Sequence, residues 1–296
     1  MRPTRSMLFV PGHRAGWAEK AVAAGTDAVI LDLEDSVPQD MKAETRHMVA
    51  ETITTLRRDN PDLGIYVRLN ALETGMMGDD LECVAVPGCD GFLPPKTYGA
   101  RDILHAEALV DHYERRNGVT PGSLEFVLSL ETAQAYADCE AMLAASPRCA
   151  TLFAGTARDA DVSRSIGFEF TPEGQETLYL RSRAVLAVRA AGKDFPIVGL
   201  WQDLKDDDGA WEFARSNKRL GFRGMVSIHP KHVAVANQVF MPTEGEVAFY
   251  QGMIDAFENG LTQGLAAVAY EGMHIDLAHV KTAKEVIALY DTLKNK

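Results

Sequence analysis

The chain has 296 residues, 46% of them hydrophobic and 24% charged, and carries a net charge of −12 at pH 7. This composition is that of a globular protein, and the length suits one large α/β domain or two smaller ones. The negative charge excludes nucleic acid as a general partner, and no apolar run is long enough for a membrane span or a signal-peptide core. The four cysteines lack paired spacing, so we expect reduced thiols in a soluble, cytoplasmic protein.

Short apolar runs typical of buried strands alternate along the chain with amphipathic stretches typical of helices. The eight strand-like runs are residues 7–11, 28–34, 65–70, 91–96, 126–131, 151–157, 195–201 and 224–229. The main helix-like stretches are residues 17–24, 42–58, 100–116, 133–145, 176–191 and 209–220. Gly25, Gly192 and Gly221 follow three of these stretches, which is typical of left-handed helix caps.

This alternation indicates a parallel sheet, and eight repeats between residues 7 and 229 predict a closed (β/α)8 TIM barrel. The alternative is an open doubly wound sheet, which usually has a G-x-G-x-x-G loop after its first strand; the sequence has none. After Pro230 the alternation stops, and residues 231–237, 244–259 and 278 onward read as helices. We therefore expect a barrel domain over residues 1–230 and a C-terminal helical extension over residues 231–296 that packs on its own barrel or on a neighbouring subunit.

Several of the strand-like runs end in charged residues. Asp35 and Arg68 lie at the ends of the second and third runs, Glu131 ends the fifth, and the sixth leads into Asp159 and Asp161. In a TIM barrel these ends meet at one mouth, where the active site lies. Two carboxylates side by side suit a hard divalent cation. For each acid taken alone, an ordinary strand-to-loop transition is the alternative, because acids also cap helices.

Five ordered motifs resemble those of the HpcH/HpaI aldolase and citrate lyase β-subunit family, which includes the malyl-CoA lyases. They are LFVPGHR (residues 8–14), LDLEDSV (31–37), VRLN (67–70), IHPKHVAVANQVF (228–240) and GMHID (272–276). The resemblance covers nearly the whole chain. It implies a Mg²⁺-dependent lyase, with Mn²⁺ as a substitute, that cleaves a 3-hydroxyacyl-CoA such as malyl-CoA or citramalyl-CoA to acetyl-CoA and a 2-oxo acid. It also implies a homotrimer or homohexamer.

The resemblance implies that Glu131 is the first metal ligand. The second is Asp159 or Asp161, because this loop is longer than in the family by up to two residues and counting from either side gives different positions. Arg68 matches an arginine that contacts substrate. Its alternative role is a structural ion pair with Glu34 or Asp35.

Other positions match residues that bind CoA or move a proton. Phe9, Arg14 and Lys20 match the CoA-contacting positions, although solvated surface is the common fate of a single Arg or Lys. Asp276 matches an aspartate that enters the active site from an adjacent subunit and transfers a proton; the alternative is a helix N-cap. Asp32 and Asp35 are expected to orient metal-bound water or Arg68.

The sequence departs from the family pattern at two strand ends. Two prolines precede Lys96, and the seventh strand-like run ends in Trp201, which we expect to narrow or reshape the acyl pocket. Three hypotheses follow: a CoA-dependent carbon–carbon lyase, a metal-dependent aldolase acting on free 2-oxo acids without CoA, and a citrate lyase β-like or non-catalytic subunit of a larger complex. The first is favoured because the CoA-matching positions are present.

Overall fold

The computed structural model describes residues 1–294. The chain forms two compact units, Met1–Gln238 and Val239–Lys296, so the division falls within helix α10 (Lys231–Phe240). Packing of the C-terminal unit on a neighbouring subunit stays a prediction. Within the described residues, no helix is both long enough and apolar enough to cross a membrane.

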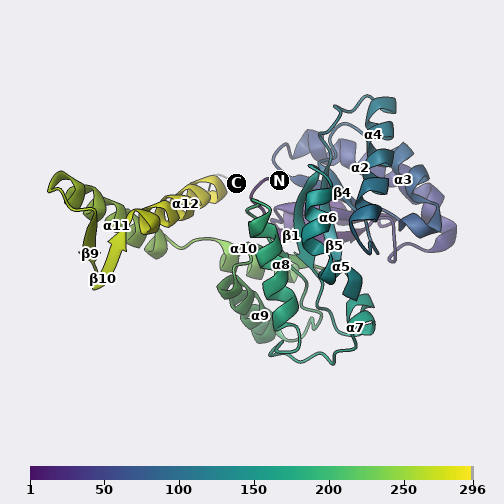
Figure 1. The fold of residues 1–296 in the computed structure, drawn as a ribbon. Coiled ribbons are helices and arrows are strands. Elements are labelled where there is room, and N and C mark those ends of the chain that lie inside the picture. Colours follow the sequence, from purple (N-terminus) through teal and green to yellow (C-terminus); the bar gives the residue numbers. More distant parts are fainter. Residues whose placement is uncertain (295–296) are drawn as a thin grey trace. The chain divides into compact units, whose positions relative to one another are not determined.

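The first unit is built around a closed barrel of parallel strands that follow one another in sequence order (Figure 1). The strands are β1 (Ser6–Pro11), β2 (Ala28–Asp32), β3 (Gly64–Arg68), β4 (Gly91–Leu93), β5 (Glu125–Leu130), β6 (Cys149–Ala154), β7 (Ile197–Val198) and β8 (Gly224–Ser227). Strand β1 pairs with β2, where Met7 lies opposite Ala28, and also with β8, where Ser6 lies opposite Met225. The predicted (β/α)8 barrel is confirmed, since an open sheet would leave its outer strands unpaired.

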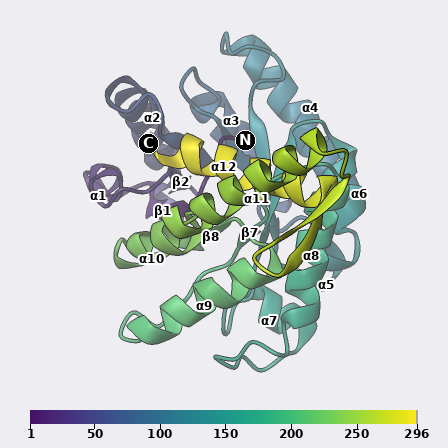
Figure 2. The same ribbon diagram turned by 90° about the vertical axis from the view of Figure 1, so that its left-hand side faces the viewer.

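Helices surround the strands in both views of the ribbon (Figures 1 and 2). They are α1 (Trp17–Ala23), α2 (Lys42–Asp59), α3 (Met77–Val84), α4 (Ala100–Arg116), α5 (Ala133–Ala137), α6 (Cys139–Ala145), α7 (Asp161–Ile166), α8 (Leu178–Ala190) and α9 (Asp207–Leu220), with short 3₁₀ turns η1 (Gln39–Met41) and η2 (Leu72–Thr74). Gly25, Gly192 and Gly221 have φ angles of 78°, 69° and 107°. The predicted left-handed caps are therefore confirmed at all three positions.

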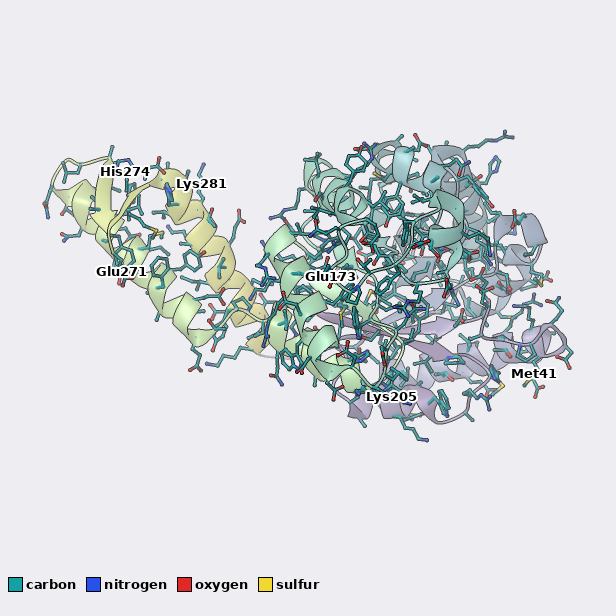
Figure 3. All side chains as sticks on the ribbon, turned by 90° about the horizontal axis from the view of Figure 1, so that it is seen from below. Met41, Glu173, Lys205, Glu271, His274 and Lys281 are labelled. Atoms are coloured by element: carbon teal, nitrogen blue, oxygen red, sulfur yellow. The ribbon has the colours of Figure 1, made fainter. Side chains whose placement is uncertain are left out.

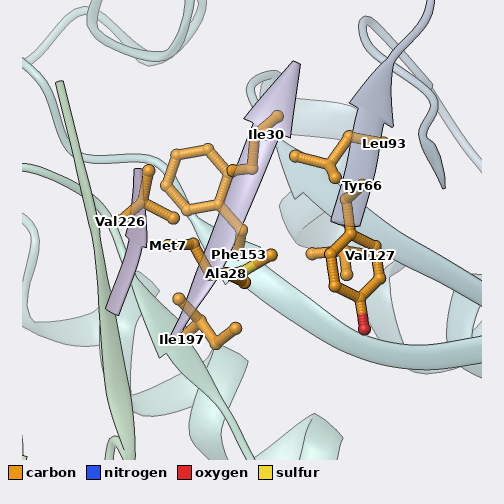
Figure 4. Close-up of a cluster of buried hydrophobic side chains, with 9 residues drawn as sticks. All are labelled: Met7, Ala28, Ile30, Tyr66, Leu93, Val127, Phe153, Ile197 and Val226. Carbon is orange, nitrogen blue, oxygen red and sulfur yellow. The ribbon is translucent and has the colours of Figure 1, made fainter. Parts of the chain in front are cut away.

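The barrel interior is filled by apolar side chains from all eight strands (Figure 4). They are Met7, Ala28, Ile30, Tyr66, Leu93, Val127, Phe153, Ile197 and Val226. The hydroxyl group of Tyr66 points away from this cluster and donates a hydrogen bond of 3.1 Å to Glu125 Oε2. Because side chains alternate along a strand, Glu125 at the start of β5 and Glu131 just after its end lie on the same, inward face. The apolar layers separate these two carboxylates.

The strands end earlier than the apolar runs predict. The runs continue to residues 34, 70 and 96, whereas β2, β3 and β4 end at Asp32, Arg68 and Leu93. Beyond β2 and β3 one further backbone bond forms in each case, from Leu33 N to Arg68 O (3.0 Å) and from Leu69 N to Leu93 O (3.2 Å). The chain then turns toward the next helix. The polar residues of the predicted mouth therefore sit at the last ladder position or just past it.

The C-terminal unit contains α11 (Glu244–Thr262), an antiparallel pair of β9 (Ala267–Tyr270) and β10 (Met273–Asp276), and α12 (Leu277–Lys294). Thr243 and Glu246 form a reciprocal capping box at the start of α11. The elements enclose an apolar cluster of their own that includes Phe257, Ile275 and Val280. The predicted C-terminal helices are confirmed, and the β-hairpin is an element that the apolar pattern did not reveal.

A buried ion pair joins α4 to the start of β6. The Arg148 guanidinium donates hydrogen bonds of 2.7 and 2.6 Å to the two carboxylate oxygens of Glu114, whose side chain is fully buried, and also contacts Asp111. It donates another of 2.9 Å to the carbonyl oxygen of Leu124, next to β5. Removing one member of such a pair leaves a buried charge without its partner.

We predict that Arg148→Met lowers the free energy of unfolding by about 3–5 kcal/mol, measured by urea denaturation. The matched control is Arg116→Met, which breaks a pair with Glu82 in which the side chains are 54% and 48% exposed. It should change the free energy of unfolding by less than about 1 kcal/mol. Equal losses in the two variants would contradict this account of the α4–β6 contact.

Candidate functional site

The mouth of the barrel is organised around a two-pronged ion pair between β3 and β2. Arg68 donates from Nε and Nη2 to the two carboxylate oxygens of Asp32, both at 2.7 Å. The side chains are 15% and 2% exposed. Asp32 also accepts hydrogen bonds from the backbone N–H of Glu34 (2.9 Å) and the Ser36 hydroxyl (2.5 Å). Burial raises the pKa of Asp32, but Arg68 and these donors outweigh burial and lower that pKa overall, so Asp32 stays ionised.

A second pair of contacts extends the network from β2 to β4. Arg68 Nη1 lies 3.1 Å from Glu34 Oε2, and Lys96 Nζ lies 2.7 Å from Glu34 Oε1 and 3.1 Å from Asp35 Oδ1. Glu34 is buried, whereas the Asp35 side chain is 59% exposed. The alternative role predicted for Arg68 is therefore present at Glu34, but Asp35 pairs with Lys96. Asp32, rather than either of them, is the main partner of Arg68.

Glu131 follows β5 directly and is held by two hydrogen bonds. Its Oε1 accepts from the Ser129 hydroxyl (2.8 Å) and its Oε2 accepts from the backbone N–H of Lys96 (3.2 Å). Lys96 has a φ of 50°, which costs a non-glycine residue of order 1–3 kcal/mol. In this conformation Lys96 binds Glu131 with its backbone and the β2 acids with its side chain. The strained residue thus couples Glu131 to the Arg68 network.

Negative charge exceeds positive charge in this network. Four carboxyl groups belong to Asp32, Glu34, Asp35 and Glu131, and the cations that contact them directly within the described residues are Arg68 and Lys96. Burial, helped by the nearby carboxylates of Asp35 and Glu131, raises the pKa of Glu34 to about 7 against the lowering effects of Arg68 and Lys96. A site with surplus carboxylate charge and oxygen donors fits a hard divalent cation. A hard divalent cation such as Mg²⁺ would reduce this surplus of negative charge.

The two aspartates predicted as second metal ligands occupy different positions. Asp159 is exposed in the loop after β6, with a φ of 53°, and Asp161 is the first residue of α7, where its carboxylate pairs with Arg164. Within residues 1–294, no group of three or more His, Cys, Asp or Glu residues is arranged to hold a metal ion. Mg²⁺ needs only one or two protein carboxylates, with water completing its shell. Glu131 with Asp159 or Asp161 stays a prediction.

The residues predicted to bind CoA divide into two groups. Phe9 lies at the mouth, where the Arg68 guanidinium carbon is 4.9 Å from the centre of its ring. Arg14, just before α1, and Lys20, on α1, are both exposed. The Arg14 guanidinium lies 5.8 Å from the ring centre of Trp17. The structure brings Phe9 into contact with the charged network but shows no such contact for Arg14 or Lys20 within the described residues. Their role in binding CoA stays a prediction.

Asp276 belongs to the C-terminal unit. It accepts a hydrogen bond of 2.9 Å from the backbone N–H of Ala278 and lies 2.8 Å from His279 Nδ1. These contacts lower the pKa of Asp276, that with His279 most strongly. The capping role predicted as its alternative is therefore present at the start of α12. Proton transfer by Asp276 stays a prediction.

Two residues that sequence reasoning missed support the site. Ser129 donates a hydrogen bond that orients Glu131. Ser129 could have been found from the sequence, because it lies two residues before Glu131 and therefore on the same inward face of β5. Lys42, at the start of α2, donates to the backbone oxygens of Leu33 (2.8 Å) and Glu34 (3.0 Å) and to Asn70 Oδ1 (2.7 Å). It ties the loops after β2 and β3 together. No pattern in the sequence marks it.

Comparison with known proteins identifies the family. Residues 5–230 match the family model described as HpcH/HpaI aldolase/citrate lyase. The chain belongs to this family. The L-malyl-CoA/β-methylmalyl-CoA lyase of Cereibacter sphaeroides is 35% identical over 307 aligned positions, covering 97% of this chain and 94% of that protein. This HpcH/HpaI-family chain is thus a lyase of the citrate lyase β and malyl-CoA lyase type.

Two further relatives extend the range of the family. The (3S)-malyl-CoA thioesterase of Cereibacter sphaeroides is 30% identical, with 97% of this chain and 94% of that protein covered. A solved structure of the citrate lyase β subunit from Mycobacterium tuberculosis, complexed with oxaloacetate and magnesium, is 26% identical with a TM-score of 0.63. The match covers 81% of this chain and 98% of that chain. Related HpcH/HpaI-family chains are thus described both as lyases and as a thioesterase.

The raised pKa of Glu34 predicts a pH-dependent stability. Its pKa moves from 4.5 to about 7 on folding, so the folded protein binds more protons than the unfolded chain between these values. The free energy of unfolding should therefore fall as the pH rises through this window. We expect Glu34→Gln to flatten this dependence, measured by urea denaturation in EDTA between pH 5 and 8, values that bracket a pKa of about 7.

The control for this measurement is Asp35→Asn, which removes the exposed partner of the same lysine. Because Asp35 is one of the acids that raise the pKa of Glu34, this variant should keep a pH dependence of the same sign, with its midpoint at a somewhat lower pH. A wild-type slope in Glu34→Gln would show that another group causes the dependence.

Proposed function

We propose that the protein is a Mg²⁺-dependent lyase that cleaves a 3-hydroxyacyl-CoA of the malyl-CoA or citramalyl-CoA type to acetyl-CoA and a 2-oxo acid. The observation that carries the proposal is the coupling of Glu131 to Arg68 at the barrel mouth through Lys96 and Glu34. A carboxylate ligand and a guanidinium are thereby held in one network on the active face of a TIM barrel. The 35% identity to a malyl-CoA lyase supports the CoA thioester as substrate.

In this proposal a divalent cation is held by Glu131 and by Asp159 or Asp161. When bound, Mg²⁺ would act as a Lewis acid and template for the carboxylate and hydroxyl oxygens of the substrate. The magnesium in the related citrate lyase β structure supports this choice of metal. Each Glu131 oxygen accepts one hydrogen bond from the protein and keeps acceptor capacity for a ligand.

Arg68 is suited to bind the substrate carboxylate or a developing negative charge on oxygen. A guanidinium has five N–H donors, and three of its nitrogens are directed at Asp32 and Glu34. Each of the two terminal nitrogens thus has a further N–H for a ligand. Because Asp32 accepts hydrogen bonds from both Nε and Nη2, the plane of the guanidinium is fixed before the substrate binds. Such a preorganised donor suits electrostatic stabilisation of a transition state.

Other assignments remain part of the same proposal. Phe9, Arg14 and Lys20 would contact CoA, and Asp276 of an adjacent subunit in a homotrimer or homohexamer would move the proton of the acetyl carbon. Asp35, through Lys96, would position the β2–β4 side of the site. The alternatives are an aldolase that acts on free 2-oxo acids and a citrate lyase β-like subunit of a complex. A cytoplasmic location likewise stays a prediction.

Thioester hydrolysis is a second candidate, favoured by the 30% identity to a malyl-CoA thioesterase. The two reactions differ in their products. Cleavage of malyl-CoA breaks a carbon–carbon bond and releases acetyl-CoA and glyoxylate, whereas hydrolysis adds water across the thioester and releases malate and free CoA. Product analysis therefore separates them directly.

We predict that malyl-CoA or citramalyl-CoA is converted to acetyl-CoA and a 2-oxo acid only with Mg²⁺ or Mn²⁺, measured by mass spectrometry. Glu131→Gln should lower kcat by at least about 10³-fold, because several kcal/mol of metal stabilisation is lost. It should also weaken Mn²⁺ binding measured by electron paramagnetic resonance. The matched control is Glu125→Gln, at the opposite end of the inward face of β5, where the carboxylate accepts from Tyr66.

Glu125→Gln should retain wild-type turnover and Mn²⁺ affinity. Full activity in EDTA, or equal losses in the two variants, would refute the metal-dependent lyase. Free CoA and malate as the only products would favour the thioesterase. Calorimetry with CoA alone distinguishes the lyase, which should bind it, from an aldolase that does not use CoA.

A further inference from the structure

A cavity of about 470 Å³ lies between the loop that follows β6, the segment between α7 and α8, and the loop that follows β7. It is lined by Arg158, Asp159, Phe170, Pro172, Trp201, Gln202, Asp203 and Asp206. In Figure 3, Glu173 marks the segment between α7 and α8, next to the lining residue Pro172, and Lys205 marks the loop after β7, next to the lining residue Asp206. The size is in the range of small-molecule sites, about 300–1,000 Å³. The mouth therefore has a second feature besides the charged network over β2–β5.

Trp201 forms a wall of this cavity and is itself well packed. It is only 4% exposed, and its ring centre lies 6.0 Å from that of Phe170 and 5.7 Å from that of Phe213 on α9. The indole is thus set back into the layer of helices, so it shapes the cavity and leaves it open. Phe170 is half-buried and forms a second aromatic wall.

Hydrogen bonds hold the segments around the cavity in place. The side-chain amide of Gln202 accepts from the backbone N–H of Arg158 (2.6 Å) and donates to the carbonyl oxygen of the same residue (3.1 Å). Arg181, buried on α8, donates to the carbonyl oxygen of Gly174 (2.5 Å) and to Asn217 Oδ1 of α9 (2.9 Å). These contacts fix the segment that carries Phe170. The cavity is therefore preformed, which lowers the entropic cost of binding.

The lining favours an apolar group over a second anion. Two aromatic rings and a proline supply the apolar surface, and the Arg158 guanidinium lies over Phe170, 4.9 Å from its ring centre. Three carboxylates line the cavity against this one cation. A methyl group, comparable in size to a water molecule of about 30 Å³, would leave most of the space empty.

Asp159 connects the cavity to the proposed reaction, because it is both a lining residue and a candidate metal ligand. Resting on the proposed function, we infer that the cavity binds the side chain of the 2-oxo-acid half of the substrate, and that this side chain is aliphatic or aromatic and larger than methyl. Malyl-CoA and citramalyl-CoA, whose 2-oxo acids carry hydrogen and methyl at this position, would then be slower substrates of the same reaction. The carboxylate and carbonyl oxygens of that half would face the metal ligands. Its remaining substituent would enter the space between Phe170 and Trp201.

The test measures condensation of acetyl-CoA with a panel of 2-oxo acids in the presence of Mg²⁺. The probes are glyoxylate, pyruvate, 4-methyl-2-oxopentanoate, phenylpyruvate and 2-oxoglutarate, and the thioester product is followed by mass spectrometry. We expect kcat/KM for 4-methyl-2-oxopentanoate to exceed that for glyoxylate by at least about tenfold, since each buried methylene contributes about tenfold or more. The second carboxylate of 2-oxoglutarate should lower kcat/KM by at least about tenfold relative to 4-methyl-2-oxopentanoate, because it would enter a cavity with surplus negative charge.

Phe170→Ala tests the cavity itself. The ratio of kcat/KM for 4-methyl-2-oxopentanoate to that for glyoxylate should fall at least about tenfold, because an apolar wall is lost. The control is Tyr179→Ala, which removes an aromatic ring that is 70% exposed on α8 and does not line this cavity. It should leave the ratio unchanged.

Each of these measurements either supports the subsite or contradicts it. A preference for glyoxylate, or an unchanged ratio in Phe170→Ala, would overturn the subsite while the lyase activity stands. If neither malyl-CoA nor any acid of the panel is turned over, the proposed function fails and the inference fails with it.

Discussion

The site depends on the buried contact between Arg68 and Asp32. Two parallel hydrogen bonds of 2.7 Å join side chains that are almost removed from water, so either charge alone would be costly at the end of its strand. The barrel register makes the pair possible, because Arg68 lies directly opposite Asp32 in the β2–β3 ladder. Once this pair is set, Glu34 and Lys96 take fixed positions around it, and the backbone of Lys96 reaches Glu131. A chain of polar contacts thus runs from β2 to β5.

In the proposed reaction, the two sides of the barrel mouth would bind different parts of the substrate. Over β2–β5 the side chains are charged and coupled to one another, which suits a cation and the oxygen atoms that it binds. Over β6 and β7 two aromatic rings form part of the cavity wall, and hydrogen bonds between Gln202 and the backbone of Arg158 join the loop after β7 to the loop after β6. Asp159, in the loop between β6 and α7, belongs to both sides, because it lines the cavity and is a candidate metal ligand. The charged side would determine the type of reaction, and the side with the two aromatic rings would determine which acyl substituent is accepted.

The sequence predicted the barrel well because buried parallel strands are continuous apolar runs and helices end at glycines such as Gly221. It also placed Arg68 and Glu131 at the mouth, since strand ends in this fold meet at one face. It could not show that Asp32, and not Glu34 or Asp35, grips Arg68, because that choice depends on strand register and on which face each side chain points to. The role of Gln202 was equally hidden, because its partner is the backbone of Arg158 and main-chain contacts leave no pattern in residue types.

The most direct test of the central claim is a crystal structure with Mn²⁺ and a 2-oxo acid, in which anomalous scattering locates the metal. The account predicts a single strong peak at the barrel mouth, about 2.0–2.2 Å from a carboxylate oxygen of Glu131 and from one of Asp159 or Asp161. Arg68 should remain on Asp32 and contact the carboxylate of the acid. A peak that is bound elsewhere, or a Glu131 carboxylate directed away from the metal and the acid, would contradict it.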